Sequence, residues 1–100
     1  AHITGGGLKE NIIRVAPAAL GIALDGSAWK RPAVFDWLQR EGNVAREEML
    51  RTFNCGIGYT LILRRDQAGH AIDVLEGLGL PAWTIGVVEA ARGDERVHIA

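Results

Sequence analysis

Three consecutive glycines, Gly5 to Gly7, form the part of this 100-residue sequence best suited to chemistry. Without Cβ atoms, they let a ligand approach the backbone closely and present several N–H groups to it. A helix predicted to begin at Leu8 would direct its unpaired N–H groups and its positive end toward the same loop. This combination favours anions, above all phosphate. We therefore predict a phosphate site at Gly5–Gly7; the alternative is a tight strand-to-helix turn that only needs glycine.

The residues around the glycines offer further polar groups. Thr4 supplies a hydroxyl donor, and a neutral His2 imidazole suits a general base or a hydrogen bond to a substrate. A structural, hydrogen-bonded histidine is the other interpretation of His2. Asn11 either reaches a ligand on the loop or hydrogen-bonds nearby backbone, and Glu10 suits the start of a helix. The candidate site is thus His2, Thr4, the three glycines and Asn11.

Familiar nucleotide and metal motifs are missing. A dinucleotide fingerprint that began at Gly5 would need a third glycine where Glu10 stands, and the chain has no Gly-Lys-Ser or Gly-Lys-Thr triplet. The three histidines show no ligand-like spacing and there is one cysteine, so we expect no metal site and no internal disulfide. We interpret that cysteine, Cys55, as a small buried residue rather than a reactive thiol.

Composition restricts the class of protein. Eleven Lys and Arg against twelve Asp and Glu give a net charge of −1, which argues against a strongly basic nucleic-acid binder. Apolar residues make up 48% of the chain, as in ordinary folded domains. No run approaches the ~20 apolar residues of a membrane span, and no secretory signal is visible, so we expect a cytoplasmic protein. A start on a glycine-rich loop without Met predicts a fragment of a longer chain.

Hydrophobic spacing and turn residues predict alternating helices and strands. Helices are expected at Leu8–Val15, from Pro32 to a stop at Gly42-Asn43, and at Val44–Phe53 with Asn43 as N-cap. A fourth helix is expected to begin after an Asp66 N-cap and to end at Gly77 and Gly79. Strands are expected at Leu20–Leu24, Tyr59–Leu63, Ala82–Val88 and Arg96–Ile99, the second buried on both faces and the last two forming a hairpin. The predicted class is α/β or α+β, a mixed sheet flanked by helices. The tryptophans, Trp29, Trp37 and Trp83, are expected as core or interface anchors.

The order of several motifs resembles one enzyme family. The stretch His2 to Asn11 is similar to the glycine loop of phosphoribosylformylglycinamidine cyclo-ligases, also called aminoimidazole ribonucleotide synthetases. The similarity continues through Trp29, Pro32, Phe35-Asp36-Trp37-Leu38-Gln39, Gly42-Asn43-Val44, Glu48-Met49, Arg51 to Gly58 and Trp83-Thr84-Ile85-Gly86. One departure is Tyr59, where the family pattern has Met or another apolar residue.

The resemblance implies a function. Family members use ATP, assisted by magnesium, to close the imidazole ring of aminoimidazole ribonucleotide from formylglycinamidine ribonucleotide in purine biosynthesis, and they are homodimers with two domains per chain. Residues 1–100 would be part of the C-terminal domain, without the N-terminal domain that carries most ATP and metal ligands. Thr4, Gly5–Gly7 and Asn11 would bind the substrate's phosphate, with His2 as a substrate-contacting or proton-transfer residue. We expect the fragment alone to be inactive.

Two other hypotheses stay open. One is a related ATP-using enzyme: formylglycinamidine ribonucleotide synthetase, selenophosphate synthetase or thiamine phosphate kinase. The stretch from Phe53 to Gly58 argues against it. The other is a non-catalytic binding or dimerisation module, which would show no phosphate affinity at the loop. Neither nucleic acid nor membrane is expected as a partner.

Overall fold

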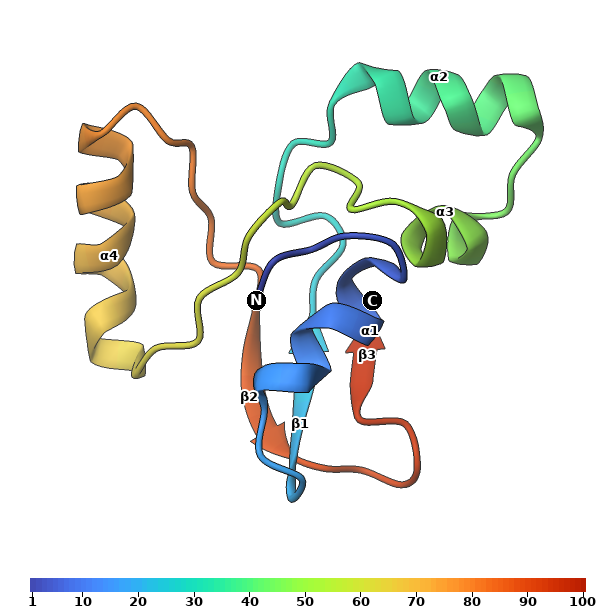
Figure 1. The fold of residues 1–100 in the computed structure, drawn as a ribbon. Helices are drawn as coiled ribbons and strands as arrows, with labels where there is room; N and C mark the ends of the chain where they lie inside the picture. The colour runs from blue at the N-terminus through green and yellow to red at the C-terminus, as the bar shows by residue number, and fades with distance from the viewer.

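A computed structural model describes all residues, 1–100, and shows four α-helices around a three-stranded sheet (Figure 1). In chain order the elements are α1 (Gly7–Ile12) with a 3₁₀ turn (Ile13–Val15), β1 (Leu20–Leu24), α2 (Ala33–Gly42), α3 (Arg46–Thr52), α4 (Arg65–Gly77), β2 (Gly86–Ala90) and β3 (Val97–Ile99). None of the helices combines the length and apolar character that crossing a membrane would require.

The sheet is mixed, with β1 at its centre. It pairs antiparallel with β2 and parallel with β3, giving the order β2-β1-β3. This confirms the α+β class and the strand at Leu20–Leu24. The expected terminal hairpin is wrong, because β2 and β3 lie on opposite sides of β1. Arg96, directly before β3, is bonded to β1 in two ways: its Nε donates to the carbonyl oxygen of Leu20 at 3.0 Å, and its own carbonyl accepts from the Ile22 N–H at 2.7 Å.

The core lies between α1 and one face of this sheet. Leu8 and Ile12 of α1 belong to the same buried cluster as Ile22 and Leu24 of β1. The remaining members are Ile3, Trp29, Ile57 and Val97. Trp29 is therefore a core anchor, as predicted, whereas Trp37 and Trp83 are about half exposed. Only 14 of 100 residues are buried, so much apolar side-chain surface faces outward.

The α2–α3 connection shows how the chain uses Asn43. Asn43 adopts a left-handed conformation (φ 50°, ψ 46°) and ends α2, with its N–H directed to the carbonyl of Arg40. The N-cap of α3 is Ala45, which makes no side-chain cap. The prediction of Asn43 as an N-cap is thus wrong. Asparagine suits both ends of a helix, and the tight connection selects the left-handed one.

The expected central strand at Tyr59–Leu63 does not form as such. Only Tyr59 makes a β-bridge, to His2, and Leu61, Ile62 and Leu63 are exposed. No backbone hydrogen bond joins Leu61–Leu63 to another segment of the chain. The strand expected at Ala82–Val88 lies later, at Gly86–Ala90, because Gly86 is the residue that faces the end of β1.

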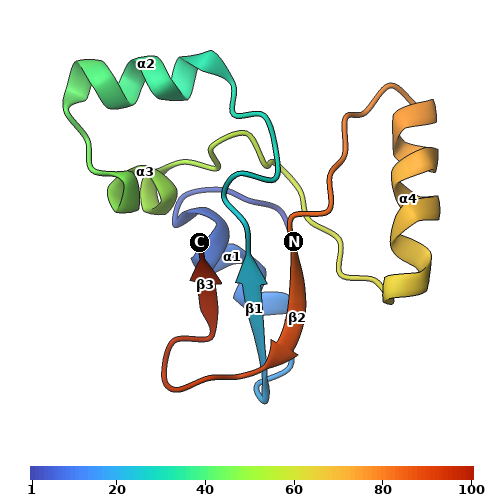
Figure 2. The same ribbon diagram turned by 180° about the vertical axis from the view of Figure 1, so that it is seen from behind.

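Helix α4 stands beside β2, apart from the α1–α3 side of the molecule (Figures 1 and 2). Its N-cap is Arg64 rather than Asp66, which sits in the first turn and makes no side-chain cap. Its predicted end is confirmed: Gly79 has φ +81°, and its N–H donates to the carbonyl of Glu76 at 2.9 Å. This left-handed glycine satisfies a terminal carbonyl of the helix.

Candidate functional site

The glycine loop joins a short extended segment to α1. Residues 1–3 run antiparallel to residues 58–60: the Ile3 N–H donates to the Gly58 carbonyl at 2.9 Å, and His2 bridges Tyr59. Ile3 and Leu8 are almost completely buried on either side of the loop. Two anchors in the core therefore fix the loop from Thr4 to Gly7 in place.

Asn11 lies beneath the loop. Its Nδ2 group is 3.2 Å from the carbonyl oxygens of Thr4 and Gly5 and 2.8 Å from that of Gly7. Its Oδ1 accepts from the Thr4 hydroxyl at 3.3 Å. Asn11 is 3% exposed, so its amide is fully engaged with the loop. Of the two roles considered for Asn11, the structure shows the hydrogen bonds to nearby backbone.

The three glycine positions differ in their backbone conformation and in the space available for a Cβ. Gly6 and Gly7 have φ values of +96° and +68°, which side chains rarely tolerate. A Cβ on Gly7 would also overlap the carbonyl oxygen of Leu50 in α3. Gly5 has neither constraint: a Cβ there would meet nothing within 4 Å. The fold explains two of the glycines, and Gly5 is left with open space above its backbone.

The loop presents its N–H groups away from Asn11. The carbonyl groups of Thr4, Gly5 and Gly7 are turned toward the Asn11 amide, whereas the N–H groups of Gly5 and Gly6 have no acceptor in the chain. Gly5 is exposed and Gly6 half-buried, and two neighbouring unpaired N–H groups are suited to an anion.

The charged side chains around the loop include both signs, which would have opposite effects on a bound anion. The Glu10 carboxylate folds back over Gly6, close enough that a Cβ on Gly6 would overlap it. The Arg14 guanidinium lies on the other side, with Nη1 3.3 Å from Oδ1 of Asn11. Arg14 was not among the residues predicted for the site, although its position three residues after Asn11 is a usable signal. Lys9 is engaged with Glu95 in an exposed ion pair.

His2 makes no hydrogen bond to the loop. Its ring is exposed and stacks on Tyr59, with ring centroids 6.3 Å apart and an interplanar angle of 26°. The structure therefore brings Thr4, the glycines and Asn11 together and places His2 on the adjoining bridge.

The remaining candidate groups lie elsewhere. No three His, Cys, Asp or Glu side chains gather where they could hold a metal ion. Cys55 is 1% exposed, as expected of a small buried residue; its thiol is 3.5 Å from the Met49 carbonyl, and Nη2 of Arg31 is 3.1 Å from its sulfur. Burial of Cys55 leaves its thiol inaccessible to a substrate.

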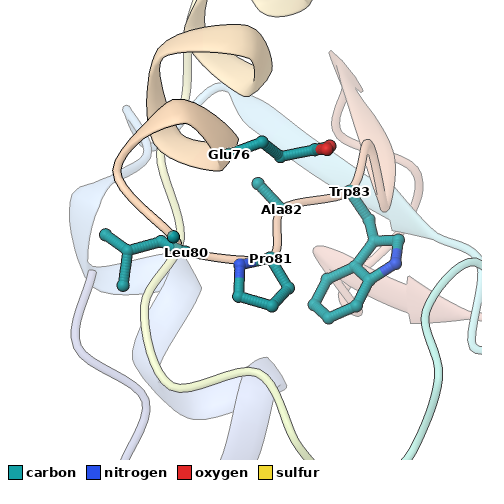
Figure 3. Close-up of a pocket in the computed structure, with 6 residues that line it drawn as sticks. Glu76, Leu80, Pro81, Ala82 and Trp83 are labelled. Carbon is teal, nitrogen blue, oxygen red and sulfur yellow. The ribbon is translucent and has the colours of Figure 1, made fainter.

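Two hollows also mark the surface around α4. One is a shallow depression at its C-terminal end, where the rings of Pro81 and Trp83 lie side by side below the Glu76 side chain (Figure 3). The other is an apolar concavity of about 700 Å³ bounded by α4, β2 and residues 57–63. Neither is lined by residues 2–7 of the candidate site.

Comparison with known proteins shows the family to which this chain belongs. The family described as AIR synthase related protein, C-terminal domain, matches residues 1–99, and the chain belongs to that family. Individual relatives are named phosphoribosylformylglycinamidine cyclo-ligase. That of Xanthomonas euvesicatoria pv. vesicatoria (strain 85-10) is 59% identical over 99 residues, or 99% of this chain. That of Xanthomonas campestris pv. campestris (strain B100) is 57% identical, and that of Xylella fastidiosa (strain Temecula1) 54% identical, each again over 99% of this chain. The chain spans 28–29% of the length of these relatives.

Proposed function

We propose that residues 1–100 are part of the C-terminal domain of a phosphoribosylformylglycinamidine cyclo-ligase. The observation that carries this proposal is 59% identity, over 99% of the chain, to a relative of that name. The complete polypeptide would form aminoimidazole ribonucleotide from formylglycinamidine ribonucleotide, as a cytoplasmic homodimer. The three related ATP-using enzymes considered above are less well supported, because the relatives compared share the cyclo-ligase name.

Within that enzyme, we assign the substrate's phosphate to the glycine loop. Support comes from the unpaired N–H groups of Gly5 and Gly6 and from the open space above Gly5. Thr4 and Asn11 contribute by holding the loop carbonyls inward, which leaves the N–H groups outward. His2 is assigned to substrate contact or proton transfer from the neighbouring bridge.

ATP and magnesium belong to the proposed reaction, but the residues of this chain do not fit them. No acidic cluster offers magnesium a set of oxygen ligands, and the basic side chains around the loop are engaged within the chain, Arg14 with Asn11 and Lys9 with Glu95. We therefore place both in the remainder of the longer polypeptide and assign them no step here. On its own, this chain is expected to be inactive.

The proposal is tested first by binding. Amide chemical shifts of the 100-residue chain are followed during titration with formylglycinamidine ribonucleotide, and with inorganic phosphate for comparison. We expect saturable shifts at Gly5, Gly6 and Leu8, larger for the nucleotide than for phosphate. The Gly5→Ala variant, in which a methyl group occupies the open space, is expected to lose them. Flat shifts in a folded sample would count against the phosphate assignment and would fit a non-catalytic module.

A second test uses an active enzyme. Residues 1–99 replace the matching segment of the Xanthomonas euvesicatoria relative, and cyclo-ligase activity of the chimera is measured. We expect activity in the chimera and a raised KM for its substrate in the Gly5→Ala version. Replacement of His2 by Ala should lower kcat if His2 transfers a proton and raise only KM if it contacts the substrate. An inactive but folded chimera would argue against the cyclo-ligase assignment itself.

A further inference from the structure

Asp25 and Gly26 form a chemically labile pair directly after β1. Asp25 is the only aspartate or asparagine of the sequence that is followed by glycine. The backbone nitrogen that follows an aspartate can attack the carboxyl carbon of its side chain, and glycine hinders this attack least because it has no Cβ. The Asp25 side chain is exposed, so water reaches it freely. The pair therefore has the chemistry of an isoaspartate site.

The reaction in question is an isomerisation that uses water alone. The Gly26 nitrogen loses its proton and bonds to Cγ of Asp25, and the hydroxyl of the neutral carboxyl group leaves with that proton as water, which closes a cyclic imide. Water then adds to either imide carbonyl. Addition at the backbone carbonyl carbon of Asp25 gives isoaspartate, in which the chain runs through Cγ and the former backbone carbonyl becomes the side-chain carboxylate. The mass is unchanged, but the backbone gains a methylene.

The fold favours both members of this pair. A Cβ on Gly26 would lie 2.9 Å from the carbonyl oxygen of Ala100 and 2.8 Å from Nη2 of Arg46, so the space at this position selects glycine. Oδ1 of Asp25 accepts hydrogen bonds from the Ser27 N–H at 2.9 Å and from the Ser27 hydroxyl at 2.6 Å. Such contacts with the backbone two residues on are a typical reason for aspartate in a turn. Neither residue is replaced without the loss of a favourable arrangement.

The same contacts oppose the reaction in the folded chain. The Gly26 N–H donates to the Ala100 carbonyl at 3.1 Å, which occupies the attacking group. The hydrogen bonds from the Ser27 hydroxyl and N–H lower the pKa of Asp25 below its ordinary value of 3.8. An ionised carboxylate resists attack because it has no hydroxyl to release. The Asp25 N–H also donates to the Ile85 carbonyl at 2.8 Å, which restrains the backbone of the turn.

We propose that Asp25 is a site of isoaspartate formation, and that the native turn slows the reaction until this corner of the sheet opens. The new carboxylate would be exposed, as the Asp25 side chain is, and an isoaspartyl methyltransferase is the class of enzyme that recognises it. The added methylene would lie between Leu24 and Trp29, which are both buried in the core. The modified chain should therefore be less stable than the original.

The site is tested by ageing the chain at neutral pH and physiological temperature, folded in buffer or unfolded in guanidinium chloride. Trypsin releases residues 15–30 as a peptide that contains Asp25 and no other aspartate. Isoaspartate in this peptide is measured by chromatography and by labelling with an isoaspartyl methyltransferase. We expect it to form at least about tenfold faster in the unfolded chain, because reaction in the folded chain waits for local opening. Equal rates in the two states, or label mainly in other peptides, would overturn the proposal.

Substitutions of Ser27 test the protective contact. In the folded chain, Ser27→Ala should accelerate the reaction by about two- to tenfold, the effect of one lost hydrogen bond. Ser27→Thr keeps a hydroxyl and should retain most of the protection, and Thr52→Ala removes a hydroxyl from α3 and should change nothing. In guanidinium chloride all these chains should react at the same rate. An unchanged rate in folded Ser27→Ala, or equal acceleration by Thr52→Ala, would contradict protection by the turn.

Discussion

The side-chain nitrogen of Asn11 lies 2.8 Å from the carbonyl oxygen of Gly7, and the asparagine that provides it is almost fully buried. The same nitrogen is within 3.2 Å of the Thr4 and Gly5 carbonyls. A single amide group thus fixes the direction of the whole loop backbone. The outward direction of the Gly5 and Gly6 N–H groups depends on this contact.

Replacement of Asn11 by Ala should therefore destabilise the chain. The loop carbonyls would lose their donor in a buried site, which typically costs about 1–3 kcal/mol. Asn11→Asp should cost more, because a carboxylate places acceptors against three carbonyl oxygens. The measurement is the free energy of unfolding in urea, with Thr52→Ala on the exposed side of α3 as a control. Wild-type stability in both Asn11 variants would contradict the structural role of the amide.

Substitutions at Gly7 and Gly5 are expected to affect different properties, stability for Gly7 and phosphate binding for Gly5. Gly7→Ala should lower the free energy of unfolding by about 1–3 kcal/mol, because its positive φ and the close Leu50 carbonyl both oppose a Cβ. Gly5→Ala should leave stability near that of the wild type and weaken phosphate binding. Urea unfolding and the amide-shift titration measure the two effects. Strong destabilisation by Gly5→Ala would mean that all three glycines serve the turn alone.

The sequence was informative where structure is determined locally. The end of α4 depends on Gly79, whose left-handed conformation satisfies the helix carbonyls within five residues, and the loop before α1 is marked by its own glycines. Burial of Cys55 was also predictable, from the small residues around it. These features need no knowledge of distant residues.

Predictions that depended on distant partners were less successful. The position of β3 beside β1 depends on backbone pairing between distant segments and on Arg96, which is 76 residues from its carbonyl partner on Leu20. The apolar residues Leu61–Leu63 favour a strand, but a strand also needs an opposite backbone, which the sequence pattern does not reveal. In the candidate site, the type and spacing of residues indicated the loop. The inward direction of Asn11 and the position of Glu10 over Gly6 depend on packing.

Cys55 should react slowly with a thiol reagent. Its side chain is 1% exposed, and Nε1 of Trp29 donates to its carbonyl at 3.0 Å, which holds this segment against the core. Reaction with Ellman's reagent in native buffer should be much slower than in denaturant. Trp29→Phe removes that donor and should increase the native rate. A fast native reaction in the wild type would mean that the segment opens readily.

The Lys9–Glu95 ion pair should be visible in the acid titration of Glu95. A hydrogen bond from Lys9, with the Lys9 charge and then that of His98, lowers the pKa of Glu95 below its ordinary value of 4.5. Because the folded-state pKa is the lower one, any stabilisation is complete above the ordinary value and is lost as pH falls through the lowered pKa. Carboxyl ¹³C shifts measure this directly. Lys9→Gln should raise the pKa, and an unchanged titration would show that the pair does not persist in solution.

Glu10 provides the sharpest test of the anion site, because its carboxylate lies over Gly6, where a phosphate would bind. Removal of that charge in Glu10→Gln should tighten phosphate binding by about two- to fivefold, the effect expected of one exposed charge. The amide-shift titration of Gly5 and Gly6 with inorganic phosphate measures the change at low salt. The matched control is Glu41→Gln, which removes an exposed charge at the end of α2 and should leave the affinity unchanged. Equal effects from the two variants would indicate a response to net charge alone, and no effect from Glu10→Gln would place the anion away from Gly6.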